Sequence, residues 1–217
     1  LSSQIENRSV KKVYLALLEG NLKEDSGKVV TKIGRNPKDR KTMAITKDGR
    51  EAITSYKVLQ RFKDNCLVAF RIHTGRTHQI RVHAKYLLHP VVGDMAYGYK
   101  KQRFNLNGQL LHSYLLGFVH PTSGEYVEFT APLPDYFLST LSVVAKESGK
   151  TVDINNYLKD MFGNTNTTWT LNNDGSQIWY INSDGMLSLA QPSNNKQIYP
   201  VIKLDPSAYV INPSVSG

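Results

Sequence analysis

The chain has 217 residues, of which 40% are hydrophobic and one is a cysteine. This length allows one well-buried core, or one core with a small second unit. The single cysteine excludes an intrachain disulfide framework and a cysteine-rich zinc site, and it suits a reducing compartment such as the cytosol. No run of apolar residues approaches the length of a transmembrane helix.

Positive charge is concentrated in the first two thirds of the chain. Residues 1–150 hold 24 Lys and Arg against 13 Asp and Glu, a net charge of +11, whereas residues 151–217 hold 3 against 5. A basic body favours a polyanionic partner. Nucleic acid is favoured over a membrane, because no basic amphipathic helix stands out.

The first 72 residues predict three strands separated by a basic, turn-rich region. Residues 11–20 are largely apolar and end at a glycine, which is typical of a buried strand. Residues 21–50 are basic and rich in turn formers, and residues 34–41 predict a loop. Residues 51–62 alternate apolar and polar side chains, and residues 66–72 form the next apolar run, so we expect a hairpin.

The stretch Thr74–His83 is dense in polar side chains, with two arginines and two histidines in ten residues. If residues 75–87 are helical, one side of the helix carries Thr77, Ile80, Arg81 and Ala84. A guanidinium beside apolar residues at the edge of a core needs a carboxylate or phosphate partner. The alternative is a solvated basic helix.

The rest of the body continues the mixture of strands and helices. Residues 110–119 and 125–130 predict a strand pair, and residues 134–147 predict a closing helix with Pro134 in its first turn. Together with the hairpin before them, these elements indicate an α+β domain built on a mixed, mainly antiparallel sheet with flanking helices.

The composition changes near residue 150. Residues 150–217 are rich in Asn, Ser and Asp, and two Asp-Gly turns flank the apolar run 177–181. This pattern predicts a small β-rich segment. We therefore expect two parts, a basic domain over 1–149 and an extension of unknown role over 150–217.

Several motifs agree in order and spacing with one known family. They are Lys12–Leu17, Gly34–Arg40, Thr74–His83, His89–Asp94, Leu111-His112 and Phe118–Pro121. Over residues 5–140 the chain resembles the C-terminal part of the catalytic domain of the RluA/RluD-type RNA pseudouridine synthases. One departure is Leu88, where the family usually has glycine, and residues 150–217 do not match the family.

The resemblance implies an isomerase that converts uridine to pseudouridine in structured ribosomal or transfer RNA. It implies no metal and no organic cofactor. It also implies a mainly antiparallel sheet with the active cleft across it. We expect a monomeric cytoplasmic protein without a membrane partner.

The resemblance also assigns site residues. Tyr14 corresponds to the family's active-site tyrosine, whose ring stacks on the flipped base, and Arg81 to the arginine that pairs with the catalytic aspartate. From its sequence context alone, Tyr14 would be a core aromatic. The candidates for RNA contact, each of which could instead be solvated, are Lys12, Arg35, Arg40, Lys41, Arg76, His78 and Gln79.

The main departure concerns the catalytic carboxylate. The family carries its aspartate in a His-Arg-Leu-Asp motif upstream of the tyrosine, and these 217 residues do not contain that motif. Asp39, Asp64 and Asp94 fit structural or solvated positions. We therefore expect a fragment that is inactive alone, with Arg81 facing a carboxylate that the chain does not contain.

Two other functions stay open on the sequence. The first is a non-catalytic RNA-binding module that uses the same basic cleft, and the second is an extracellular binding protein defined by the tail. A glycosylation sequon at Asn166-Thr167-Thr168 fits the second, although such triplets are common by chance. His78 and His83 lie on different faces of the predicted helix, so a core or RNA-facing role is favoured over metal binding.

Overall fold

The computed structural model describes residues 1–152, 171–173, 177–181 and 187–190. By their internal contacts the residues divide into two compact units, Leu1–Thr165 and Asn166–Gly217. The boundary that we predicted near residue 150 lies earlier than this division. The sequon at Asn166 lies outside the described residues.

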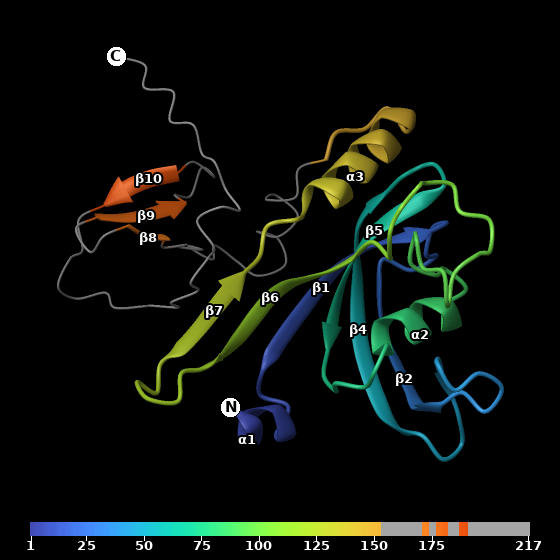
Figure 1. Ribbon diagram of the computed structural model, residues 1–217, viewed down its shortest axis with the longest axis horizontal. Coiled ribbons are helices and arrows are strands. Elements are labelled where there is room, and N and C mark those ends of the chain that lie inside the picture. Colours follow the sequence, from blue (N-terminus) through green and yellow to red (C-terminus); the bar gives the residue numbers. More distant parts are fainter. Residues whose placement is uncertain (153–170, 174–176, 182–186, 191–217) are drawn as a thin grey trace. The chain divides into compact units, whose positions relative to one another are not determined.

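The first unit is built on a seven-stranded sheet with the order β3-β2-β4-β5-β1-β6-β7 (Figure 1). Every neighbouring pair is antiparallel. The strands are β1 (Lys11–Glu19), β2 (Ser26–Arg35), β3 (Met43–Ile45), β4 (Arg50–Arg61), β5 (Asn65–Ile72), β6 (Leu111–Val119) and β7 (Tyr126–Thr130). The helices are α1 (Ser2–Glu6), α2 (Gln79–Tyr86) and α3 (Asp135–Glu147). The predicted α+β class with a mainly antiparallel sheet is confirmed.

Strands β1 and β5 form the centre of the sheet and are buried on both faces. Leu15, Ala16, Leu17 and Leu18 of β1 are fully buried, which explains why residues 11–20 form a continuous apolar run. One face packs against α3 through Leu15, Leu17 and Phe137. The other face packs against α2 through Leu18, Phe70 and Ile80.

Strands β2 and β3 were missed in the sequence, where residues 21–50 were interpreted as turn-rich. In β2 the side chains alternate, with Val29 and Ile33 buried and Lys28, Val30 and Lys32 exposed. Because Lys28 and Lys32 add to the charge of residues 21–50, the composition of this region does not reveal the alternation of a strand. The prediction of an irregular region over 21–50 is therefore wrong for 26–35 and 43–45, whereas the loop between these strands is confirmed.

Helix α2 begins at Gln79, four residues later than predicted. His78, directly before it, adopts a left-handed conformation with φ of 55°, which ends the irregular segment. After the helix, Leu88 also has a positive φ of 67° and is exposed. Glycine adopts that conformation without strain, which gives a physical reason for the glycine that the family has there.

The described part of the second unit is a three-stranded antiparallel sheet with the order β10-β9-β8. Its strands are β8 (Leu171–Asn173), β9 (Gln177–Ile181) and β10 (Leu187–Ala190). The predicted β-rich character of this segment is confirmed, while the turns between the strands lie outside the described residues. Among the described residues, no helix is long and apolar enough to span a membrane.

His83 of α2 is fully buried between α2 and the sheet. Its two ring nitrogens lie 2.9 Å from Thr31 Oγ1 and 2.8 Å from Thr54 Oγ1. Burial lowers the pKa of His83 from 6.5 to about 4, so the ring is neutral in the folded protein at pH 7. Of the two roles left open for this histidine, the structure gives it the core one.

This burial predicts a loss of stability in mild acid. The unfolded chain takes up a proton at His83 below about pH 6.5, whereas the folded protein does so only near pH 4. The free energy of unfolding should fall over this window by about 3 kcal/mol from His83 alone. Urea unfolding at several pH values measures it.

The control is His83→Gln, which removes this titration, while the pKa values of His73 and His78, also lowered, still contribute. Between pH 6.5 and 4, the stability of His83→Gln should fall less than that of the wild type. Equal pH slopes for the two proteins would contradict the burial of a neutral His83.

Candidate functional site

Tyr14 lies on the face of the sheet that carries α2. It is directly opposite Phe70 on β5 and Ser113 on β6. Its ring packs at the edge of the cluster that contains Phe70, Ile72 and Ile80, and it stays partly exposed. A half-buried aromatic ring on a sheet surface offers a flat apolar wall to another planar group.

Lys12 lies two residues before Tyr14 and therefore on the same face of β1. A Cβ atom placed on Gly75 would be 3.9 Å from Lys12 Nζ, so the ammonium group reaches the start of the 74–83 segment. Burial lowers the pKa of Lys12. The structure thus brings together Tyr14, Lys12 and the backbone around Gly75.

A hydrogen-bond network centred on Gln79 holds the loop before α2. Gln79 Oε1 accepts from Thr74 Oγ1 at 2.8 Å and from the Arg76 amide at 3.0 Å. Gln79 Nε2 donates to Ile53 O and to Thr54 Oγ1 on β4. The side chain is 3% exposed. The prediction that Gln79 contacts RNA is therefore wrong, because its amide is buried and bonded within the protein.

Arg76 follows Gly75 and is half-buried. Its Nε donates to the carbonyl of Glu51 at 2.8 Å. The side chain lines an open hollow of about 370 Å³ together with Arg50, Asp48 and the glycines at 34 and 49. Arg76 thus stays placed for an anionic ligand, and its assignment to RNA contact stays a prediction.

Arg81 does not face a missing partner. Its Nε and Nη2 donate to the two carboxylate oxygens of Asp94, each at 2.7 Å. The Arg81 side chain is 14% exposed and that of Asp94 is 0% exposed. Arg81 has the carboxylate partner that its place beside apolar residues requires, and the prediction that this partner is missing from the chain is wrong.

The turn at Gly93 explains how Asp94 reaches Arg81. Gly93 has a φ of 78°, and a Cβ there would lie 2.4 Å from the carbonyl oxygen of Gly108. Asp94 Oδ1 also accepts from the backbone amides of Ala96 and Tyr97. Burial acts to raise the pKa of Asp94, but Arg81 and these amides outweigh it, and the pKa lies below its usual value.

His78 and Tyr97 extend this buried pair towards β3. The Tyr97 hydroxyl accepts from the Met43 amide at 2.7 Å and lies 2.8 Å from His78 Nδ1. The Arg81 guanidinium carbon lies 4.7 Å from the centre of the Tyr97 ring. Burial and the charge of Arg81 lower the pKa of His78. An RNA contact of this half-buried histidine stays a prediction.

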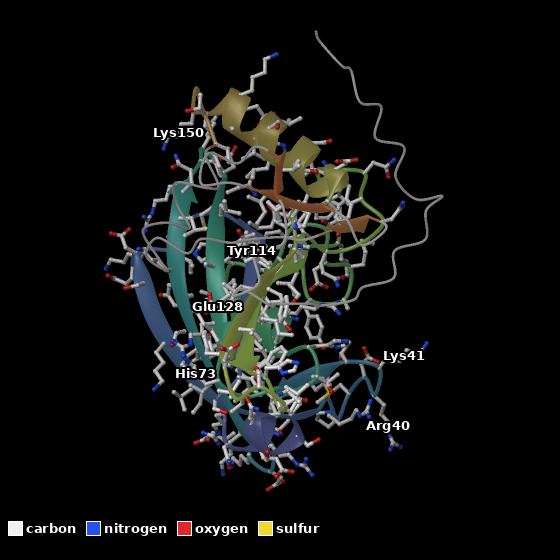
Figure 2. The ribbon with its side chains drawn as sticks, turned by 90° about the vertical axis from the view of Figure 1, so that its left-hand side faces the viewer. Arg40, Lys41, His73, Tyr114, Glu128 and Lys150 are labelled. Carbon is white, nitrogen blue, oxygen red and sulfur yellow. The ribbon has the colours of Figure 1, made fainter. Side chains whose placement is uncertain are left out.

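The remaining predicted RNA contacts lie on the hairpin between β2 and β3. Arg35, Arg40 and Lys41 are exposed, and Figure 2 shows Arg40 and Lys41 at the outer edge of the molecule. Arg35 Nη1 donates to the carbonyl of Arg40 at 3.0 Å, which closes the base of this loop. Phosphate contact by these residues stays a prediction.

Comparison with known proteins agrees with this geometry. Residues 1–86 match the family described as RNA pseudouridylate synthase. The chain is 49% identical over 135 residues to an uncharacterized RNA pseudouridine synthase of Bacillus subtilis, YlyB, and the match covers 62% of this chain and 44% of that protein. It is 40% identical over 173 residues to ribosomal large subunit pseudouridine synthase D of Neisseria meningitidis, covering 74% and 46%.

A solved structure, human RNA pseudouridylate synthase domain containing 1, superposes with a TM-score of 0.60 at 30% identity, covering 75% of this chain and 69% of that one. The chain belongs to the RNA pseudouridine synthases. The resemblance to their RluA/RluD type is thereby confirmed. A second solved structure, human RNA pseudouridylate synthase domain containing 4, shares the fold at 22% identity and a TM-score of 0.54.

The chain spans less than half of the curated synthases named above, 44% of one and 46% of the other. Within the matched part, three features had not been predicted: the partner of Arg81, the role of Tyr97 and the burial of Gln79. The Gly93-Asp94 turn carried the only sequence signal for the first of them. Nothing local to Gln79 distinguishes a buried amide from an exposed one.

The buried ion pair predicts a large stability cost when its cation is removed. Arg81→Ala leaves Asp94 buried without a counter-charge, so the free energy of unfolding should fall by about 3 to 5 kcal/mol. Urea unfolding measures this loss. The matched control is Arg76→Ala, which removes a half-buried arginine whose side chain bonds to a carbonyl, and it should cost clearly less. A loss for Arg81→Ala no larger than for Arg76→Ala would contradict this role of the pair.

Proposed function

We propose that this chain carries the tyrosine-bearing part of the catalytic domain of an enzyme that isomerises uridine to pseudouridine in RNA. The position of Tyr14 supports this proposal most directly. Its ring is partly exposed on the face of the sheet that also carries Lys12, whose ammonium reaches the loop at Gly75. A uracil base turned out of an RNA stack needs a flat apolar surface, and stacking offsets part of the cost of extrusion.

The reaction moves the uracil without changing its composition. The bond between N1 and the ribose C1′ breaks, the base turns, and C5 bonds to C1′ in its place. C5 gives up its proton and N1 gains one, so neither an oxidant nor a cofactor is required. The base must stay bound while it is detached, and the Tyr14 ring is the group that would hold it.

The carboxylate for this reaction is proposed to lie outside these 217 residues. Asp94 is committed to Arg81 and is fully buried, so it cannot reach a nucleoside. The His-Arg-Leu-Asp motif of the family is not in the sequence. We therefore expect the chain to be inactive alone. Arg81 acts as a positioning residue that fixes α2.

Two observations support the substrate class, the exposed cations of the protein and the name of a similar protein. The exposed cations of the β2–β3 hairpin suit a phosphate backbone. Among the relatives, the Neisseria protein is named as acting on the large ribosomal subunit. We propose ribosomal RNA before transfer RNA for this chain, acting as a cytoplasmic monomer.

A non-catalytic RNA-binding module is the second candidate, since the sequence does not contain the His-Arg-Leu-Asp motif. Joining an upstream segment that contains His-Arg-Leu-Asp to this chain separates the two. The isomerase proposal predicts release of tritium from RNA labelled at C5 of uridine. If the joined protein binds RNA and releases no tritium, the binding module is favoured.

Substitution of Tyr14 tests the stacking role. Tyr14→Ala should weaken RNA binding by the joined protein about 5- to 150-fold, since stacking of one base contributes about 1 to 3 kcal/mol. Tyr14→Phe retains the ring and should bind as the wild type does. Fluorescence anisotropy with a labelled RNA hairpin that holds the target uridine measures both. Equal binding by Tyr14→Ala and Tyr14→Phe would count against base stacking at this position.

A further inference from the structure

The sheet has a second face, opposite α2 and Tyr14, and part of it carries a row of cations. Lys28 of β2 is directly opposite Ser55 of β4, and Ser55 is directly opposite Arg71 of β5. Neighbouring strands lie about 4.8 Å apart, so these three side chains follow one another across the sheet. Val29, Thr54 and Phe70 beside them point to the α2 side and are buried.

Lys57 extends this row along β4. It lies two residues after Ser55 and therefore on the same face, and it is exposed, as are Lys28 and Arg71. Within the described residues, no carboxylate forms an ion pair with Lys28, Lys57 or Arg71. We call Lys28, Ser55, Lys57 and Arg71 the back-face cluster.

The carboxylates nearby are occupied by other cations. Glu51 pairs with Arg8 at 2.8 Å, and Glu128 pairs with Lys11 at 2.7 Å and accepts from the Tyr126 hydroxyl. Within the described residues, these two carboxylates therefore form their ion pairs with cations outside the back-face cluster. Lys57 lies diagonally across from Lys28 on β2 and from Arg71 on β5, within reach of long side chains, and a bound anion would reduce the repulsion between these like charges.

His73 shows that these charges converge on one place. Its Nε2 lies 2.9 Å from Ser55 Oγ. Burial, and then the positive charges of Arg71, Lys28 and Arg8, lower the pKa of His73. Figure 2 shows His73 and Glu128 on the side of the sheet turned to the viewer, with Arg40 and Lys41 at a different edge. The cluster is thus separate from the hairpin.

We propose that the back-face cluster is a second RNA-phosphate-binding surface, which holds the backbone of a structured RNA on the face of the sheet opposite Tyr14. Lysine and arginine heads around a hydroxyl suit phosphate oxygens. An RNA that also contacted the β2–β3 hairpin would meet the back face of the sheet and a separate edge of the protein. The inference rests on the proposed function only in taking RNA as the polyanion.

The salt dependence of RNA binding tests the proposal, and it needs no turnover. The protein is the full chain, the probe is a fluorescein-labelled RNA hairpin, and affinity is measured by anisotropy at several salt concentrations. The variant K28Q/K57Q/R71Q removes three charges from the cluster. The control K23Q/K63Q/K146Q removes three exposed charges elsewhere.

Loss of three phosphate contacts should make the slope of log affinity against log salt shallower by about 2 or more. The control should change the slope by less than about 1. Equal changes in the two variants, or no change in the cluster variant, would overturn the proposal. If the cluster variant shows the shallower salt slope but the joined protein releases no tritium, the isomerase proposal fails and the back-face proposal stands.

A second measurement on the unmodified chain covers the case in which the cluster variant does not fold. Acetylation of lysines is followed by mass spectrometry, with and without the RNA hairpin. RNA should protect Lys28 and Lys57 and leave Lys23 and Lys63 reactive. If polyglutamate protects Lys28 and Lys57 and RNA does not, the surface binds an acidic protein and the proposal is wrong.

Discussion

The buried ion pair between Arg81 and Asp94 fixes α2 to the segment that follows it. Arg81 belongs to α2, while Asp94 belongs to the segment after it, which is bound to β1. The Val92 amide donates to Leu17 O, and the Glu19 amide donates to Pro90 O, each at 2.9 Å. Since β1 also carries Tyr14, the pair links the helix to the strand that would hold the base. A charge pair with one fully buried partner tolerates little displacement.

The Gln79 network performs the same task on the other side of α2. It joins the loop at Thr74 and Arg76 to β4, so the helix is fixed at its first residue by an amide and two residues later by the ion pair. The loop at Gly75 therefore holds a defined position next to Lys12. Gln79, which the sequence predicts as an RNA contact, instead bonds within the protein and fixes the loop that RNA would meet.

Sequence patterns predicted the elements whose side chains follow one simple period. The continuous apolar run of β1 and the alternation of β4 both gave the correct strands. Strand β2 also alternates, but two of its exposed positions are lysines, Lys28 and Lys32, and the count of charges and turn formers over residues 21–50 masked the alternation. Lys28 belongs to the back-face cluster, and only the cross-strand register shows that it lies in line with Arg71.

The sequence predicted those features of the site that depend on residues close together in the chain. That Arg81 needs a carboxylate follows from its place beside apolar residues, and this requirement is confirmed. Which carboxylate it meets depends on the sharp turn at Gly93, and no property of Asp94 alone distinguishes it from a solvated turn residue. Gln79 illustrates the same limit, since its burial depends on Thr54 from a distant strand. Interaction partners that are far apart in the sequence can be identified only once the fold is known.

A double-mutant cycle on Arg81 and Asp94 tests the central claim most directly. The free energies of unfolding of wild type, Arg81→Ala, Asp94→Ala and the double variant are compared. If each residue is buried against the other, the double variant should cost much less than the two single losses combined, with a coupling energy of about 2 to 3 kcal/mol. Additivity within about 0.5 kcal/mol would contradict the pair as the interaction that fixes α2.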